Sequence, residues 1–363
     1  MRIGIIYGGR SAEHDVSRQS AFNVLNAIDR SAHEIVVLRI DRHGSWRRED
    51  PDAFLARTLL ADERGSVPTG GGDLPLRSGD QPVPVPARPI MSAPAALQAL
   101  DVVFPVLHGP YGEDGSVQGL LKTAGIPFAG PGVLAAAVGM DKDVMKRLLA
   151  GAGIPVADFR VAHASGARPA WDAIAGALGS PVFVKPANMG SSVGIRKVAE
   201  PAAFAEALED AFAYDTKIVI ERAVAGREIE CAVLGNDEPV ASVAGEVITH
   251  HEFYSYEAKY LDEDGAELVI PAHLEPPVSE RVREMALDAF RALCCDGMAR
   301  VDFFLQEDGV LLVNELNTIP GFTRISMYPK LWEASGIAYG ELVERLLKLG
   351  IERYERERRL RCD

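Results

Sequence analysis

The sequence predicts an α/β protein of more than one domain, beginning with a doubly wound domain in which helices cover a parallel sheet. Its 363 residues, 47% of them hydrophobic, exceed what one hydrophobic core usually organises and indicate two or three domains. Residues 2–40 have the pattern strand, glycine turn, helix and strand, which is typical of a doubly wound domain. Towards the other end, residues 298–321 contain two apolar runs around a tight-turn sequence, the pattern of a β-hairpin.

The first domain is expected over residues 1–130. Arg2–Tyr7 forms a short apolar strand, a helix runs from about Val16 to Ile28, and Glu34–Ile40 forms the next strand. In doubly wound domains, ligands bind at the carboxyl ends of the strands. Glu13 lies at such a strand–helix junction and is a candidate for binding a substrate ammonium group. The alternative is that this acidic residue only favours the helix N-terminus.

A second loop of this domain carries polar residues at a strand end. Asp101–Leu107 is a buried strand, and His108 follows it in the glycine-rich sequence HGPYGEDG. Both a ligand-facing role and a structural role are consistent with a histidine at this place. Residues from about 41 to 94 are rich in proline and glycine, which favours a loop or edge hairpin inserted into the first domain.

A central unit is expected over residues 131–224, after the Gly-Pro pair that ends the first domain. Lys142 lies at the start of a helix that runs to about Ala150. Lys185 lies near the end of an apolar strand, and residues 188–194 follow as a glycine-serine loop. Backbone N–H groups of such a loop can approach phosphate oxygens closely, with Lys185 as a point charge. An ordinary hairpin loop is the alternative.

The third unit is expected over residues 225–363. Residues from about 247 to 270 are polar, aromatic and acidic without helical periodicity, which suits a lid that orders over a bound substrate. Pro277–Leu293 has the pattern of an amphipathic helix. A helix near Tyr339–Leu349 leads into a charged tail, which is expected to be solvated because its opposite charges recur at i,i+4 spacing.

The hairpin at residues 298–321 carries the strongest chemical signal. Asp302 lies on its first strand, and Glu315 and Asn317 lie at the exit of the second. Alternate strand residues share a face, so Glu315 and Asn317 are expected to point together towards Asp302, beside Arg300. Two carboxylates and an amide make an oxygen-only site, which suits Mg²⁺ better than Zn²⁺. A single acidic residue of a hairpin is more often solvated surface.

The composition excludes several classes of function. A formal charge of −14 argues against nucleic-acid and anionic-membrane partners, although local lysines can still bind anionic substrates. No apolar run approaches the length of a membrane span, and the first residues do not form a signal peptide. The four cysteines lack CxxC spacing and are expected to be reduced thiols. We therefore expect a cytoplasmic protein.

Six separated blocks, in this order, resemble the D-alanine–D-alanine ligase family of the ATP-grasp fold. They are Gly8-Gly9-x-Ser11-Ala12-Glu13, His108 through Gly119, Met140-Asp141-Lys142, Lys185 through Gly194, Tyr256 through Tyr260, and Asn314 through Gly321. The resemblance covers almost the whole chain. It is weakest in the Pro/Gly-rich insert and in the charged tail. It implies an ATP-grasp fold preceded by the doubly wound domain.

For the nucleotide, the resemblance implies that Lys142 and Lys185 bind the ATP phosphates. Glu221 and the backbone near Arg222 and Val224 would hold the adenine. Arg222 departs from the lysine expected after Glu221, which leaves its backbone contact in place but not a side-chain contact to the base.

Other residues would bind sugar, phosphate and metal. The resemblance implies that Glu228 binds the ribose and that Lys259 contacts the transferred phosphate and the second D-alanine. Asp302, Glu315 and Asn317 would bind two Mg²⁺ ions, or Mn²⁺ in their place, with Glu315 bridging.

The amino-acid sites follow from the same resemblance. Glu13 would bind the ammonium group of the first D-alanine, and His108 would lie near its carboxylate. Arg300 and the backbone N–H of Gly321 would stabilise the oxyanion, and Ser326 would bind the second D-alanine.

Closure of the lid has its own residue set in this family. Glu13, Ser191 and Tyr260 would form a hydrogen-bonded triad that fastens the lid over the site.

The implied reaction is ATP-dependent formation of D-alanyl-D-alanine through a D-alanyl phosphate, for peptidoglycan precursors, by a homodimer. Charge neutralisation by Mg²⁺, lysines and arginine suits phosphoryl transfer between anions. Two alternatives stay open: a D-alanine–D-lactate ligase, which Tyr260 disfavours, and a nucleotide-binding regulatory protein without catalysis.

Overall fold

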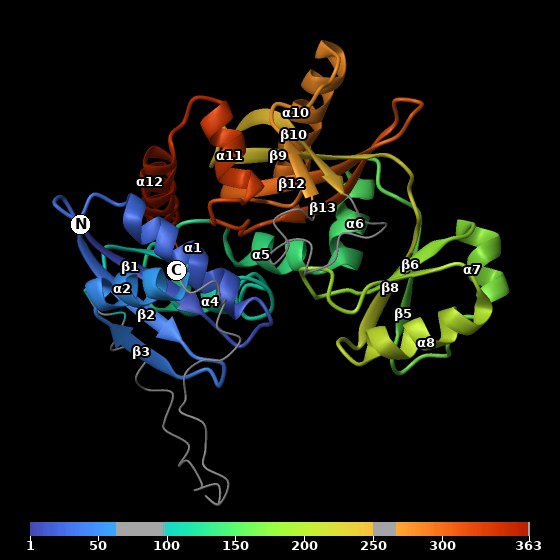
Figure 1. Ribbon diagram of the computed structural model, residues 1–363, viewed down its shortest axis with the longest axis horizontal. Helices are drawn as coiled ribbons and strands as arrows, with labels where there is room; N and C mark the ends of the chain where they lie inside the picture. The colour runs from blue at the N-terminus through green and yellow to red at the C-terminus, as the bar shows by residue number, and fades with distance from the viewer. Residues whose placement is uncertain (63–96, 98, 250–265, 362–363) are drawn as a thin grey trace, which may run out of the picture.

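The computed structural model describes residues 1–62, 97, 99–249 and 266–361. Its strands form three sheets that follow one another along the chain (Figure 1). Figure 1 shows the N-terminal sheet in blue at one end, the small central sheet in yellow-green at the other, and the C-terminal sheet between and above them. Among the described residues, no helix combines the length and apolarity that crossing a bilayer requires.

The N-terminal sheet has the strand order β3-β2-β1-β4. β1 pairs in parallel with β2 and β4, and β3 pairs antiparallel with β2 at the edge. Ile3 and Ile5 of β1 pack in one cluster with α1 and with α12 (Tyr339–Arg358), whereas Ile6 packs on the other side with α4. Helices therefore cover both faces, as the doubly wound prediction requires. The elements are β1 (Arg2–Gly8), α1 (His14–Ala27), β2 (Glu34–Ile40), β3 (Trp46–Glu49), α2 (Pro51–Asp62), β4 (Val102–Val106) and α4 (Ser116–Thr123).

The stretch from about 41 to 94 begins with regular structure. β3 extends the sheet as an edge strand, and α2 packs beside α1 and β2. Phe54 of α2 is buried and its ring lies 4.8 Å from that of Tyr7. The helix was not expected from the proline and glycine content, which is concentrated further on. Residues 63–94 lie outside the described part of the chain.

The central sheet is antiparallel, with the order β5-β8-β6-β7. Val182 and Val184 of β6 pack with α7 and α8 on one face. Because side chains alternate, Lys185 of β6 and Glu221 of β8 lie on the opposite face, towards the middle of the molecule. The elements are β5 (Phe159–His163), α7 (Trp171–Leu178), β6 (Val182–Pro186), β7 (Arg196–Val198), α8 (Pro201–Phe212) and β8 (Lys217–Arg222).

The C-terminal sheet has the order β11-β10-β9-β12-β13 and is antiparallel throughout. α10 packs on one face, together with α5 and α6, and α11 and α12 pack on the other. The elements are α5 (Val133–Met140), α6 (Lys142–Gly151), β9 (Arg227–Gly235), β10 (Val240–Thr249), β11 (Ala266–Val269), α10 (Pro276–Ala292), β12 (Gly297–Leu305), β13 (Leu311–Asn317), α11 (Met327–Ala334) and α12 (Tyr339–Arg358).

The hairpin predicted at residues 298–321 consists of β12 and β13. Its second strand is longer than expected, so Glu315 lies within β13, whereas Asn317 is its last residue and lies at the strand exit as predicted. The register shifts after Asp302, which pairs with Glu315, because Phe303 pairs with Val313 and Asn314 is left over as a bulge. The bulge turns Glu315 and Asn317 to the face opposite Val313, which is buried against α10.

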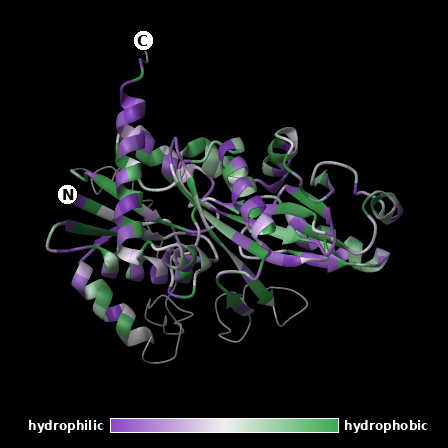
Figure 2. Ribbon diagram, turned by 90° about the horizontal axis from the view of Figure 1, so that it is seen from above, coloured by the Kyte–Doolittle hydropathy of each residue, from purple (hydrophilic) through white to green (hydrophobic). Residues whose placement is uncertain are grey.

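The expectation of a solvated tail is wrong for Arg353. Figure 2 shows hydrophilic residues along much of α12, the helix that leads to the C-terminus. Arg353 is nevertheless buried, because its guanidinium stacks 4.3 Å from the ring centre of Phe128 and donates to the carbonyls of Phe128 (2.9 Å) and Gly130. This helix therefore packs on the segment that leaves the N-terminal sheet.

Candidate active site

The β12–β13 hairpin brings the predicted metal ligands together. Asp302 lies opposite Glu315, and Arg300 lies opposite Asn317. The amide Nδ2 of Asn317 donates to Asp302 Oδ2 at 2.9 Å. The Glu315 side chain keeps about a third of its surface exposed (29%), facing a pocket.

Arg300 is held between two carboxylates on this face. Its Nε donates to Asp302 Oδ1 at 2.7 Å and a terminal nitrogen donates to Asp302 Oδ2 at 2.7 Å, which is a bidentate pair. Glu230 Oε2 of the neighbouring strand β9 lies 2.8 Å from the same Nε. Sequence reasoning gave Glu230 no role. Its alternation with Glu228 along β9 was the available signal, because both residues share one face of the strand.

The donor chemistry of the hairpin fits a hard cation. Asp302, Glu315 and Asn317 offer carboxylate and amide oxygens from facing strand positions. In the part of the chain that the structure describes, no three His, Cys, Asp or Glu side chains gather as a metal site, so an amide has to complete this set. Oxygen donors of this kind suit Mg²⁺ or Mn²⁺ rather than Zn²⁺.

Lys142 connects the hairpin with the glycine-serine loop. It is the first residue of α6, whose N-cap Asp141 accepts a hydrogen bond from the backbone N–H of Val144 at 3.1 Å. Its Nζ donates to the carbonyl of Met189 in the loop at 2.6 Å and lies 3.9 Å from Glu315 Oε2. The lysine is therefore placed between two segments that sequence reasoning assigned to phosphate and metal binding.

Glu221 is buried between two lysines. Lys185 of β6 pairs with its Oε2, and Lys146 of α6 pairs with its Oε1. Burial raises the pKa of the Glu221 carboxyl, but the charges of Lys146 and Lys185 outweigh it and lower the pKa below its usual value. Lys146 was not predicted as a site residue. Its position one helical turn after Lys142 was the signal, because i,i+4 residues share a helix face.

Three further residues predicted to bind the nucleotide, Arg222, Val224 and Glu228, follow Glu221 closely in the sequence. The backbone N–H of Arg222 donates to the carbonyl of Asp158 at 2.9 Å, so a base contact through this residue would use its carbonyl. Val224 lies just after the end of β8 and Glu228 lies on β9, and both are half-buried. Lys259 and Tyr260 lie outside the described residues.

Glu13 joins the N-terminal domain to the glycine-serine loop. The Ser191 hydroxyl donates a hydrogen bond to Glu13 Oε1. A Cβ at Gly109 would lie 2.5 Å from Glu13 Oε2, and one at Gly190 would lie 3.0 Å from it, so both loops reach the carboxylate through glycines. Glu13 is buried and lines the pocket. Two of the three predicted triad members thus meet.

Glu113 is a second buried carboxyl beside Glu13. It accepts a hydrogen bond from the backbone N–H of Gly109 at 2.7 Å. Burial, with the nearby Glu13 charge adding to it, raises the pKa of Glu113 well above its usual value. Glu113 belongs to the HGPYGEDG motif, but no role was predicted for it from the sequence.

His108 is buried at the rim between the N-terminal and C-terminal segments. Its Nε2 lies 3.1 Å from the hydroxyl of Ser20, and its Nδ1 lies 3.1 Å from the carbonyl of Ile319. Burial lowers the pKa of His108 to about 4. The imidazole is therefore neutral at pH 7 and does not supply a positive charge, and both of its nitrogens are engaged by groups of the chain.

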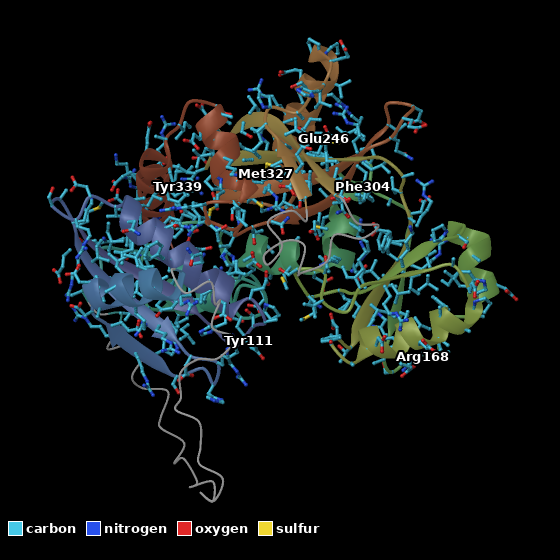
Figure 3. All side chains as sticks on the ribbon, viewed as in Figure 1. Tyr111, Arg168, Glu246, Phe304, Met327 and Tyr339 are labelled. Atoms are coloured by element: carbon cyan, nitrogen blue, oxygen red, sulfur yellow. The ribbon has the colours of Figure 1, made fainter. Side chains whose placement is uncertain are left out.

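One pocket collects most of the predicted residues. Gly321 and Ser326 lie at its C-terminal rim, where a Cβ at Gly321 would come within 2.7 Å of Ser326 Oγ. The Ser326 hydroxyl accepts from the backbone N–H of Thr323 at 3.0 Å. Met327, labelled in Figure 3, lines the same pocket at the start of α11. The predicted residues that line it are Glu13, His108, Lys142, Ser191, Arg300, Glu315, Asn317, Gly321 and Ser326.

Two family profiles match this chain. The profile "D-ala D-ala ligase N-terminus" matches residues 2–131, and "D-ala D-ala ligase C-terminus" matches residues 148–348. The chain belongs to the D-alanine–D-alanine ligase family. A D-alanine–D-alanine ligase of Shouchella clausii is 49% identical, over 99% of this chain and 97% of the relative. D-alanine–D-alanine ligase A of Escherichia coli is 45% identical, over 99% of this chain and 98% of the relative.

Solved structures of these ligases share the fold. The D-alanine–D-alanine ligase of Coxiella burnetii superposes with a TM-score of 0.81 at 36% identity, covering 99% of this chain and 96% of that one. The VanG D-Ala:D-Ser ligase of Enterococcus faecalis gives a TM-score of 0.77 at 31% identity, covering 96% and 99%. The fold is the ATP-grasp fold, preceded by the doubly wound domain, as the sequence predicted.

Proposed function

We propose that this enzyme joins two D-alanine molecules into D-alanyl-D-alanine for peptidoglycan precursors, with conversion of ATP to ADP and phosphate. The observation that carries the proposal is the convergence on one pocket of nine residues that the resemblance assigned to this reaction. These residues come from six separate parts of the chain: the loop after β1, the loop after β4, α6, the glycine-serine loop, the β12–β13 hairpin and the segment between β13 and α11.

The nucleotide would lie between the central sheet and the C-terminal sheet. Lys142 and Lys185 would bind its phosphates, because the Lys142 ammonium group contacts the loop at residues 188–194 and Lys185 lies on the strand that leads into this loop. Glu221, with the backbone near Arg222 and Val224, would hold the adenine, and Glu228 would bind the ribose. Lys259 would contact the phosphate being transferred.

The hairpin would hold the divalent ions. Asp302, Glu315 and Asn317 would bind two Mg²⁺, or Mn²⁺, which would neutralise charge on the triphosphate oxygens when bound. Arg300, now paired with Asp302 and Glu230, would remain beside them as the fixed positive charge of the site.

The first D-alanine would lie across the pocket from the hairpin. Glu13 would pair with its ammonium group, and the neutral His108 would lie near its carboxylate. Ser191 and Tyr260 would complete the triad that fastens the lid over the bound substrates. Ser326 and Lys259 would bind the second D-alanine.

The chemistry follows from the weakness of a carboxylate as an acyl donor. The first carboxylate attacks the γ-phosphorus of ATP, ADP leaves, and an acyl phosphate forms. The amine of the second D-alanine then attacks the acyl carbon and loses a proton, and phosphate leaves with its bonding electrons. Arg300 and the N–H of Gly321 would stabilise the oxyanion of the tetrahedral intermediate. Because acyl phosphates hydrolyse in water, closure of the site protects the intermediate.

The test is ADP and phosphate release by the purified chain with Mg²⁺, ATP and D-alanine. Release with D-alanine, but not with ATP alone or with L-alanine, is expected, together with D-alanyl-D-alanine as the product. Product formation from D-alanine with D-lactate or D-serine would instead assign a different second substrate. Nucleotide binding without any ADP release would indicate a regulatory protein.

The setting of the enzyme completes the proposal. We propose that it acts in the cytoplasm as a homodimer, with units at residues 1–130, 131–224 and 225–363, and without nucleic-acid or membrane partners. Size-exclusion chromatography with light scattering tests the dimer.

A further inference from the structure

Lys146 is a buried cation that none of the proposed binding roles uses. Its side chain is about 1% exposed, and it lies on α6 one turn after Lys142. Its ammonium group pairs with Glu221 Oε1 and donates to the carbonyl of Asn314 at 3.2 Å. A buried ammonium group without partners would be strongly unfavourable, so these two contacts define where it lies.

The two partners of Lys146 belong to different sheets. Glu221 is on β8 of the central sheet, and Asn314 is the bulge residue of β13 in the C-terminal sheet. The bulge at Asn314 is the feature that turns Glu315 and Asn317 towards the pocket. Lys146 therefore ties the strand proposed to hold the adenine to the bulge that orients the proposed metal ligands.

The two lysines on Glu221 differ in their freedom to move. Lys185 keeps about a tenth of its side chain exposed (11%) and lies on the strand that leads into the loop at residues 188–194. A flexible lysine stem can carry its ammonium group from a carboxylate to a phosphate. Lys146, in contrast, is closed off from solvent and is held by a carboxylate and a backbone carbonyl. It is not placed to contact a nucleotide.

We infer that Lys146 is a positioning residue for nucleotide binding. It keeps Glu221 ionised and correctly oriented when the Lys185 side chain moves its ammonium group from Glu221 to the triphosphate. The inference rests on the proposed function, which places adenine at Glu221 and phosphate at Lys185. Burial lowers the pKa of Lys146 and the charge of Lys185 adds to this, whereas the charges of Glu221 and Glu315 oppose it. Without Lys146, the movement of Lys185 to the triphosphate would leave the buried Glu221 carboxylate without a counter-ion. The free-energy cost of this unpaired charge would weaken ATP binding.

The experiment compares the steady-state kinetics of four variants with those of the wild-type chain, varying ATP and D-alanine separately. The variants are Lys146→Met, Glu221→Gln, the double variant Lys146→Met/Glu221→Gln, and Lys348→Met. Lys146→Met keeps an unbranched side chain of similar length without the charge. Lys348 is an exposed lysine of α12 and serves as the matched control.

Lys146→Met is expected to raise the KM for ATP about tenfold, because the affinity for ATP should fall about tenfold. The KM for D-alanine should stay within about twofold, and Lys348→Met should match the wild type. In the double variant, the KM for ATP should rise by clearly less than the product of the two single effects, because Lys146 acts through Glu221. A merely structural role would lower the unfolding temperature without separating the two KM values.

Two results overturn the inference: equal changes of both KM values in Lys146→Met, or effects of Lys146 and Glu221 that multiply in the double variant. If Lys146→Met does not fold, the double variant decides, because the only charge of this group that it keeps is that of Lys185, whose side chain retains 11% exposure. A KM for ATP in the double variant far above that of Glu221→Gln then overturns the inference. If Glu221→Gln alone leaves the KM for ATP unchanged, the proposed adenine site is wrong. A wild-type chain without ATP-dependent ligation contradicts the proposed function itself.

Discussion

The Ser191 hydroxyl donates a hydrogen bond to the Glu13 carboxylate although the two residues are 178 positions apart in the chain. Ser191 adopts a left-handed backbone conformation (φ 49°), and its neighbour Ser192 does the same (φ 61°). Such conformations are unfavourable for residues other than glycine and persist where surrounding contacts hold them. The contact with Glu13 is one of these restraints, and it connects the N-terminal domain to the loop proposed to bind phosphate.

Replacing Ser191 by alanine should loosen this connection. The lost hydrogen bond is charge-assisted, so we expect the free energy of D-alanine binding to weaken by about 1.5–3 kcal/mol. This corresponds to a KM for D-alanine raised about tenfold or more. The measurement is the initial rate of ADP release at varied D-alanine. Ser165→Ala, at an exposed turn of the central unit, is the control and should behave as the wild type. An unchanged KM would remove the Ser191–Glu13 contact from the substrate site.

Glu315→Gln should abolish turnover while leaving the fold intact. The substitution keeps the shape of the side chain but removes a carboxylate charge from the proposed metal site, and we expect kcat/KM to fall at least about 100-fold. The thermal unfolding temperature should stay close to that of the wild type, since the side chain is partly exposed. Glu307→Gln, at the exposed turn of the same hairpin, is the matched control. Retained activity in Glu315→Gln would exclude this residue as a metal ligand.

Stability should fall as the pH is lowered through the range set by His108. Burial lowers its pKa to about 4 in the folded chain, whereas an unfolded histidine titrates near 6.5. Between these values the unfolded state binds more protons, so the stabilising effect is complete above about pH 6.5 and is lost on acidification. We expect a loss of about 2 kcal/mol at pH 5.

Urea unfolding of the wild type and His108→Gln at pH 7 and pH 5 measures this contribution. The variant should lose less stability than the wild type over this range. His163→Gln, at an exposed position on β5, should retain the wild-type dependence. Identical pH dependence in His108→Gln and the wild type would show that His108 is not the group responsible.

Arg353→Met should destabilise the chain without removing a catalytic group. The substitution leaves the carbonyls of Phe128 and Gly130 without their buried donor. We expect a loss of about 2–4 kcal/mol in the free energy of unfolding. Urea unfolding measures it, with Arg358→Met on the exposed side of α12 as the control. Equal stability of the two variants would mean that the buried contacts of Arg353 contribute nothing measurable.

Much of the local structure could be predicted because its signals are local. Short apolar runs predicted β1, β2 and β6, and two apolar runs around a turn predicted the hairpin. The alternation of side chains along a strand predicted that Glu315 and Asn317 share a face. It could not predict the bulge at Asn314, without which Val313 and Glu315 would point the same way.

Contacts between distant segments could not be predicted from periodicity. The meeting of Glu13 with Ser191 was expected only because of the family resemblance. The burial of Lys146 and Arg353 was not expected at all. A lysine or arginine in an amphipathic helix is usually solvated, and only the neighbouring segments decide whether a carboxylate or carbonyl lies within its reach.

The sequence by itself determined which residue types lie at the ends of which strands, because side-chain alternation and turn chemistry act over a few residues. It thereby determined the oxygen donors Asp302, Glu315 and Asn317. Only the tertiary structure decided which charges neutralise each other, as in the Lys146–Glu221–Lys185 group. The physical reason is that electrostatic interaction and burial depend on distances in space, which are set when the two sheets pack around α6.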